Sequence, residues 1–220
     1  MARQTVQERS VRLPAGDVML EGDLALPPAA RGVVLFAHGS GSSRHSSRNR
    51  YVAGELRSAG LGTLLMDLLT EQEEYEERVT RHLRFDIGLL ARRLAAAVDW
   101  LQARPETRDF GIGLFGASTG GGAALVAAVE RPDAVRAVVS RGGRPDLAGE
   151  ALRRVQAPTL LLVGGHDYPV IEMNREALAQ LPCEKALEIV PGATHLFEEP
   201  GTLEQVAALA RDWFLRHLEE

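Results

Sequence analysis

A serine with a glycine two positions away on each side lies between an apolar run and a run of small residues. Residues 116–120 read GASTG, after FGIGLF and before GGAALVAAVE. Small residues relieve crowding in a tight strand-to-helix turn, and such a turn lifts the serine hydroxyl above the edge of a sheet. We therefore predict that Ser118 is a nucleophile. The alternative is a glycine-rich turn that only packs a helix close to the sheet.

A serine hydroxyl is a weak nucleophile at neutral pH, so it needs a base and a group that orients the base. His195, in PGATHLF, follows the apolar run ALEIV, and Asp167, in VGGHD, follows the apolar run TLLLV. The order Ser118, Asp167, His195 is that of a nucleophile-elbow hydrolase, and all three would lie at the carboxyl ends of parallel strands. Taken singly, the histidine reads as a surface residue and the aspartate as a turn former. Together with the serine they predict a catalytic triad.

The tetrahedral oxyanion formed by such a nucleophile needs two hydrogen-bond donors. One expected donor is the backbone N–H of Thr119, directly after the nucleophile. The other is expected in the loop HGSGS, which follows the apolar run VVLFA, and we assign it to the N–H of Ser40. The alternative interpretation of that loop is a flexible turn.

Two further charged features lie close to the expected site. Arg141 directly follows the apolar run AVRAVVS, so it would lie at the same edge of the sheet and could bind a substrate carboxylate bidentately. The favoured alternative is an ion pair within the turn RGGRPD. The acidic run Glu71–Glu77 is interpreted as a solvated helix face rather than as part of the entrance to the site.

Short apolar runs alternate with helical patterns from about residue 31 onward. This alternation predicts an α/β fold with a mostly parallel sheet and helices on both faces. Several runs are apolar almost throughout, as expected of strands that are covered on both faces. The expected strands are 11–13, 18–26, 33–37, 61–66, 110–115, 134–140, 159–163 and 186–190. The expected helices are 49–59, 85–104, one from 119, 146–153, 170–181 and 202–217, the last with Thr202 as its N-cap.

The composition indicates how many domains to expect and which classes of partner to exclude. The chain has 220 residues, of which 45% are hydrophobic, and no linker divides it, so we expect one domain over residues 1–220. A net charge of −5 does not provide the excess of positive charge that attracts nucleic acid or anionic lipid. The start is polar, no apolar run approaches the length of a membrane helix, and Cys183 has no possible disulfide partner. These features predict a cytoplasmic protein with no nucleic-acid or membrane partner.

Two other motifs are rejected. Residues 111–116 match G-x-G-x-x-G, but they form the body of a predicted strand rather than the turn after it, so they are not a dinucleotide site. The histidines and acidic residues do not have the spacing of metal ligands, so no metal site is expected.

The combination of HGSGSS, GASTGG, GGHD and PGATHLF resembles the α/β-hydrolase superfamily, from about residue 18 onward. The short, uninterrupted chain is similar to bacterial dienelactone hydrolase-like proteins. That resemblance implies a sheet of about eight strands, no cofactor, and hydrolysis through an acyl-enzyme. Dienelactone hydrolases carry Cys at the nucleophile position, where this chain has Ser118. A general carboxylic ester or lactone therefore fits better than dienelactone itself.

The segment between the runs AVRAVVS and TLLLV has room for one helix and two loops, but not for a lid domain. An open site favours small, accessible esters. The expected function is that of a serine hydrolase that cleaves small carboxylic esters or lactones. The alternatives are an acyltransferase or perhydrolase on the same fold, or an α/β-hydrolase fold without activity that binds a small molecule. The sequence indicates no oligomeric state.

Overall fold

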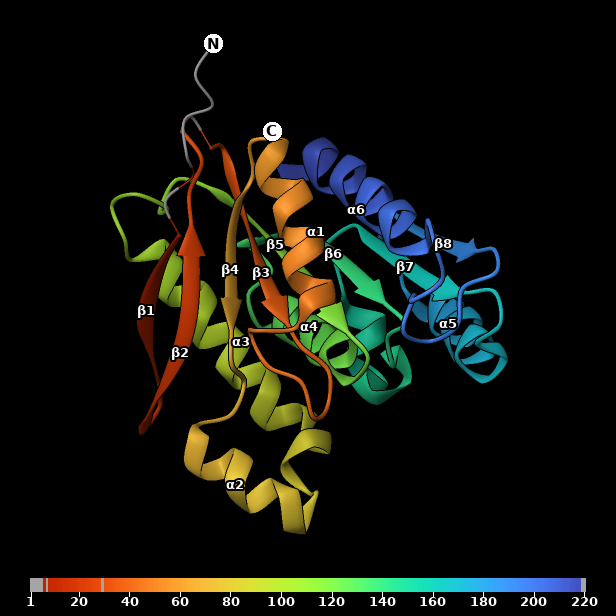
Figure 1. The fold of residues 1–220 in the computed structure, drawn as a ribbon, viewed down its shortest axis with the longest axis horizontal. Coiled ribbons are helices and arrows are strands. Elements are labelled where there is room, and N and C mark those ends of the chain that lie inside the picture. Colours follow the sequence, from red (N-terminus) through yellow and green to blue (C-terminus); the bar gives the residue numbers. More distant parts are fainter. Residues whose placement is uncertain (1–5, 7, 29, 219–220) are drawn as a thin grey trace.

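Eight strands form a single sheet in the order β1-β2-β4-β3-β5-β6-β7-β8 in a computed structural model that describes residues 6, 8–28 and 30–218 (Figure 1). The pairs β1–β2 and β2–β4 are antiparallel, and every other pair of neighbours is parallel. The strands are β1 (Glu8–Ala15), β2 (Val18–Ala25), β3 (Gly32–Ala37), β4 (Gly62–Met66), β5 (Gly111–Ala117), β6 (Val135–Arg141), β7 (Thr159–Gly164) and β8 (Lys185–Val190). The predicted fold class is confirmed.

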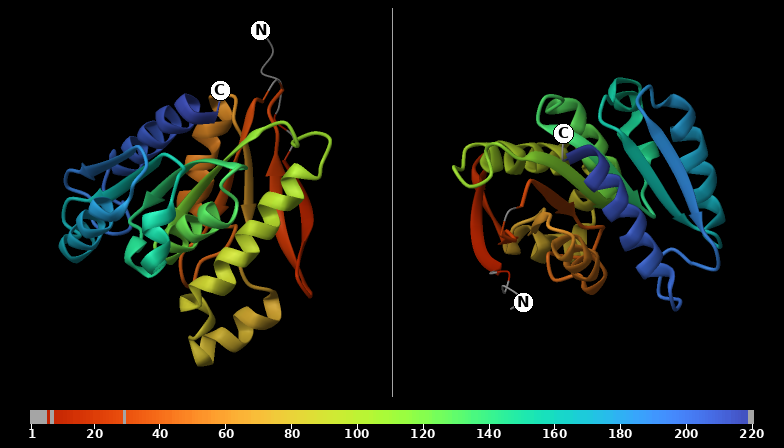
Figure 2. Two further views of the ribbon diagram at one scale, coloured as in Figure 1. Left: turned by 180° about the vertical axis from the view of Figure 1, so that it is seen from behind. Right: turned by 90° about the horizontal axis from the view of Figure 1, so that it is seen from above.

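Helices cover both faces of the sheet, so the core has two layers (Figure 2). The helices α1 and α6 pack on one face, and α3, α4 and α5 pack on the other. The strands β3 to β7 are buried on both sides, which explains why the sequence shows them as continuous apolar runs, whereas the edge strand β8 is partly exposed. The helical elements are α1 (Ser47–Ser58), α2 (Glu71–Thr80), η1 (Leu83–Phe85), α3 (Ile87–Gln102), α4 (Thr119–Glu130), η2 (Pro145–Arg154), α5 (Tyr168–Gln180) and α6 (Thr202–Leu218).

Two helical predictions need correction. The expected helix 146–153 is the 3-10 element η2, and Gly149, with φ +54°, interrupts it. Thr202 is the first residue of α6 rather than its N-cap, and its hydroxyl donates to the carbonyl of Glu199 (2.7 Å). Since η2 is the only helical element between β6 and β7, no lid domain lies there.

The acidic run 71–77 forms most of α2, which projects beyond the end of the sheet (Figure 1). Thr70 and Glu73 form a capping box at its start. The run is not a solvated face throughout, because the Glu77 side chain is only 1% exposed and its Oε1 accepts from Arg84 Nε (2.7 Å). The interpretation as a solvated face is therefore wrong for Glu77, whose buried carboxylate pairs with Arg84 in η1.

Among the helices of the described residues, none combines the length and the apolar character that a membrane crossing requires. The first five residues, which belong to the polar start of the sequence, lie outside the described part of the chain.

Candidate active site

Ser118 lies in the turn between β5 and α4 with a backbone conformation that few residues other than glycine adopt. Its φ is +52° and its ψ is −123°. Glycines on both sides permit this turn: a Cβ at Gly116 would approach the carbonyl oxygen of Gly120 to 2.4 Å, and one at Gly120 would approach that of Ala37 to 2.4 Å. The N–H of Ser118 donates to the carbonyl of Arg141 (3.2 Å). Strain of this kind, held by the surrounding backbone, is typical of functional residues.

Asp167 and His195 meet although 28 residues separate them along the chain. Asp167 follows β7, His195 follows β8, and their Oδ2 and Nδ1 atoms are 2.6 Å apart. The two loops approach closely because Gly164 has no side chain: a Cβ there would be 2.6 Å from the carbonyl oxygens of both Ala193 and Thr194. An Nδ1–H that donates to a carboxylate leaves Nε2 free to act as a base.

Ser118 and His195 line one cavity of about 200 Å³. Within the described part of the chain, no hydrogen bond joins the two side chains. A long nucleophile–base contact is common in unliganded hydrolases and shortens when substrate binds. The structure therefore brings the predicted acid and base into contact, and it places the predicted nucleophile on the wall of the same cavity.

The two residues assigned to the oxyanion hole, Ser40 and Thr119, also lie together. Their side-chain oxygens are 3.1 Å apart, and Ser40 lines the cavity of Ser118. Among the described residues, neither backbone N–H donates to another group, so both are free to bind an oxyanion. Gly39 permits the close approach, because a Cβ there would be 2.9 Å from the Cβ of Ser118.

Arg141 lines the cavity but takes no part in the ion pair that the turn RGGRPD suggested. The acid in that turn, Asp146, pairs with Arg144 instead (2.7 Å). Arg141 is 7% exposed, its guanidinium lies 5.7 Å from the ring centre of Phe197, and its Nε has no hydrogen-bond partner in the described structure. Burial lowers the pKa of Arg141 to about 10, so the side chain is still protonated at neutral pH. The ion-pair interpretation is therefore wrong.

Two residues that the sequence analysis missed lie at the start of α1. Arg48 and Asn49 line the same cavity as Ser118, and Ser46, which caps α1, lies beside them. Asn49 is 2% exposed, and neither its Oδ1 nor Nε of Arg48 has a hydrogen-bond partner within the described residues. The available signal was the position of RNR directly after the Gly/Ser loop, because the first turn of that helix must face the same edge of the sheet.

The cavity is therefore electropositive in a chain whose net charge is −5. It carries the guanidinium groups of Arg48 and Arg141 and the N-terminus of α1. The Nη1 of Arg48 pairs with the exposed Glu198 (3.2 Å), whereas Arg141 has no acidic partner among the described residues. No group of three or more His, Cys, Asp or Glu side chains in the described residues is placed to hold a metal ion.

The sequence pattern of the dienelactone hydrolase family matches residues 20–219. The chain belongs to that family. A solved structure named dienelactone hydrolase, from Anabaena variabilis, is 63% identical, covers 97% of this chain and 99% of its own, and superimposes with a TM-score of 0.95. A serine hydrolase without lid from Xanthomonas campestris shares the fold at 21% identity, with a TM-score of 0.75 over 98% of this chain and 97% of its own.

Curated relatives from two strains of Mycobacterium tuberculosis are 58% identical over 213 residues and are named phosphoribosyl transferases. That match covers 97% of this chain but 47% of the relatives, so the chain spans about half the length of the curated relatives it matches. The α/β-hydrolase fold and the family are thus established independently of that name.

Proposed function

We propose that the chain is a serine hydrolase that cleaves small carboxylic esters or lactones through an acyl-enzyme. The observation that carries this proposal is the 2.6 Å contact between Asp167 Oδ2 and Nδ1 of His195, because His195 lines the same cavity as Ser118. The strained backbone of Ser118 and the free N–H groups of Ser40 and Thr119 support it.

The proposed reaction has two halves. Ser118 Oγ attacks the carbonyl carbon, while His195 Nε2 takes the hydroxyl proton and Asp167 stabilises the imidazolium. The N–H groups of Ser40 and Thr119 bind the oxyanion. The tetrahedral intermediate collapses, the C–O bond breaks, and His195 returns the proton to the leaving alcohol. Water then attacks the acyl-enzyme with His195 as base, the bond between the acyl carbon and Ser118 Oγ breaks, and His195 returns the proton to Oγ as the acid is released.

We propose further that the substrate carries an anionic group, which Arg141 binds. A buried guanidinium without a partner is costly, and a bidentate carboxylate would satisfy it. Arg48 and the N-terminus of α1 add positive charge to the same cavity. The name of the Anabaena relative, dienelactone hydrolase, supports a lactone among the substrates.

Acyl transfer to an alcohol, or perhydrolysis, would use the same residues. The absence of a lid domain between β6 and β7 leaves the cavity open to water, which favours hydrolysis. The name phosphoribosyl transferase belongs to proteins about twice as long as the matched segment, so it gives no argument for the activity of this chain. Product analysis with competing alcohols and peroxide would separate hydrolysis from the other two reactions.

The decisive experiment is Ser118→Ala, assayed on p-nitrophenyl esters of increasing chain length and on enol lactones. We expect kcat to fall by about 10⁵- to 10⁶-fold, as in triad knock-outs, and labelling by a fluorophosphonate probe to disappear. A wild-type chain that no ester, lactone or fluorophosphonate engages would instead support the role of an inactive binding protein. Full esterase activity in Ser118→Ala would disprove the mechanism.

A further inference from the structure

The loop that carries the Ser40 N–H does not pack completely against the side chains behind it. A small cavity of about 10 Å³ lies there, lined by His38, Ser40 and Thr119 and by apolar side chains such as Leu68 and Leu90. An oxyanion donor acts only if its direction is fixed before the reaction. Polar contacts made by His38 and Asp67 hold this loop.

His38 supplies the first contact. It is 6% exposed, and both of its ring nitrogens are engaged: Nε2 accepts from the N–H of Leu68 (3.0 Å), and Nδ1 lies 2.9 Å from the carbonyl oxygen of Gly39. Nε2 can accept only if the proton is on Nδ1, which then donates to Gly39. Burial lowers the pKa of His38, so this neutral tautomer persists at neutral pH.

The contact with Gly39 sets the direction of the oxyanion donor. The carbonyl of Gly39 and the N–H of Ser40 belong to one planar trans peptide, so they point in opposite directions. The carbonyl accepts from His38 and from the N–H of Ser42 (3.1 Å). The N–H of Ser40 is therefore turned away from the His38 ring, and the Ser40–Thr119 hydroxyl contact keeps the two donors side by side.

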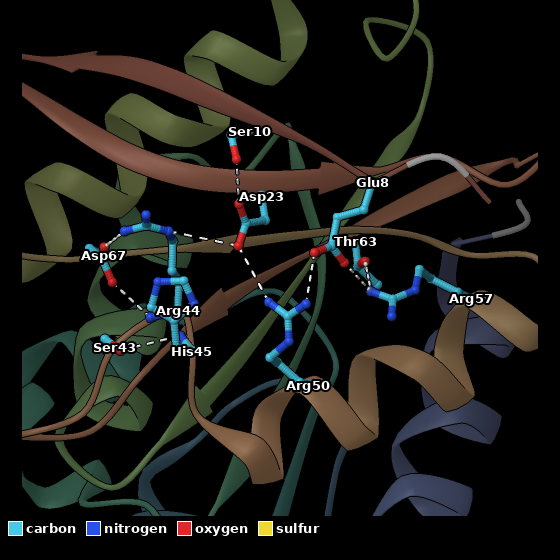
Figure 3. Close-up of polar contacts among 10 residues, drawn as sticks. All are labelled: Glu8, Ser10, Asp23, Ser43, Arg44, His45, Arg50, Arg57, Thr63 and Asp67. Carbon is cyan, nitrogen blue, oxygen red and sulfur yellow. Dashed lines mark hydrogen bonds and ion pairs between the residues drawn. The ribbon is translucent and has the colours of Figure 1, made fainter.

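Asp67 supplies the second contact, further along the same loop. Its Oδ1 accepts from the backbone N–H of Arg44 (2.7 Å), and its Oδ2 pairs with the Arg44 guanidinium (Figure 3). The same guanidinium also faces the buried Asp23 on β2 (3.7 Å). Asp67 and Leu68 are adjacent residues that follow β4, so one short segment holds the loop at two points.

The geometry points to His38 and Asp67 as positioning residues of the oxyanion hole: they fix loop 38–44 against residues 67–68 and so direct the N–H of Ser40. Neither side chain touches the reacting atoms. This inference rests on the proposed function, because it requires that Ser40 and Thr119 bind an oxyanion.

The test compares His38→Leu, which removes both ring contacts, with His38→Gln, whose side-chain oxygen can still accept from Leu68. Three quantities are measured: kcat per titrated active site, KM, and the inhibition constant of phenylboronic acid, whose tetrahedral adduct occupies the oxyanion hole. We expect His38→Leu to lower kcat about ten- to one-hundred-fold, less than the loss of a whole donor. Boronate binding should weaken by a similar factor, with KM within about two-fold. His38→Gln should recover most of both losses.

Asp67 is tested with a matched control from the same ionic network. Asp67→Ala removes the contacts to Arg44, whereas Glu8→Gln weakens the pairs that Glu8 makes with Arg50 and Arg57, away from the loop (Figure 3). We expect kcat and boronate affinity to fall about three- to ten-fold in Asp67→Ala and to change less than two-fold in Glu8→Gln. This pair decides the question if His38→Leu does not fold.

Unchanged kcat and boronate affinity in His38→Leu, or equal losses in His38→Leu and His38→Gln, would overturn the inference. A lower fraction of titratable sites with unchanged kcat per site would do the same, because it indicates a role in stability alone. The proposed function fails differently: activity would then survive Ser118→Ala, whatever the His38 variants show.

Discussion

On one side of the candidate active-site cavity, Ser118, Asp167 and His195 follow the carboxyl ends of β5, β7 and β8, and backbone geometry places them. On the other side lies loop 38–46, and the segment from Asp67 to α2 lies behind it. Both are held by side chains: a buried histidine and several arginine–carboxylate pairs. The first side needs only strands in register and small residues at the turns. The second needs particular polar partners from distant parts of the chain. Substitutions on the two sides should therefore affect activity and stability differently.

The largest effect on kcat is expected on the side of the cavity that carries Ser118, Asp167 and His195. Asp167→Asn keeps the shape of the side chain but no longer favours the His195 tautomer with its proton on Nδ1. We expect kcat to fall about 10⁴-fold while the folded structure persists, as in other triads. The measurement is kcat on a p-nitrophenyl ester beside the circular dichroism spectrum. Asp146→Asn, at an acid paired with Arg144, is the control and should leave kcat unchanged. A loss below ten-fold in Asp167→Asn would place the orienting acid elsewhere.

The difference between the two sides of the cavity also explains which features the sequence predicts. The eight strands and the positions of Ser118, Asp167 and His195 depend on local patterns: apolar runs of strand length, and polar residues directly after them. The structure confirms the strands to within a few residues, apart from an earlier start of β1. The catalytic roles of the three residues stay a prediction that kinetics must test.

The other side of the cavity depends on contacts that no local pattern contains. In the sequence His38 is only part of a Gly/Ser loop, because its ring accepts a hydrogen bond from Leu68, thirty positions later. The sequence likewise predicts a solvated Glu77, because the hydrogen bond from Arg84 appears only in the structure. One local signal was available, since the spacing of Thr70 and Glu73 is that of a capping box and marks the start of α2.

An intermediate effect is expected at Arg141, which ends β6 and lines the cavity. Arg141→Met should raise KM for p-nitrophenyl succinate, which carries a free carboxylate, by about ten- to one-hundred-fold, since a charge-assisted bidentate contact is lost. The uncharged p-nitrophenyl butyrate should show a change below about two-fold. Arg144→Met, on the same turn but paired with Asp146, is the matched control. Equal effects on both esters would show that Arg141 supports the cavity wall instead of binding an anion.

The smallest effect is expected in α2, where side-chain pairing acts on stability rather than on chemistry. Burial alone would raise the pKa of Glu77, but hydrogen bonds from Arg84 and from the N–H of Leu83 outweigh it and lower that pKa. The carboxylate therefore stabilises the fold above its ordinary pKa, and this contribution is lost as the pH falls through the lowered value.

Glu77→Gln should cost about 1 kcal/mol, which corresponds to a fall in Tm of about 2–4 °C in a chain of this size. The loss should be local, so amide exchange should rise about five-fold in α2 and stay unchanged in β5. In the wild type, exchange in α2, corrected for its intrinsic pH dependence, should rise in acid, whereas Glu77→Gln should lack this rise. An equal rise of amide exchange in α2 and β5 would mean that α2 unfolds together with the sheet. The difference between the two regions would then not extend to their stability.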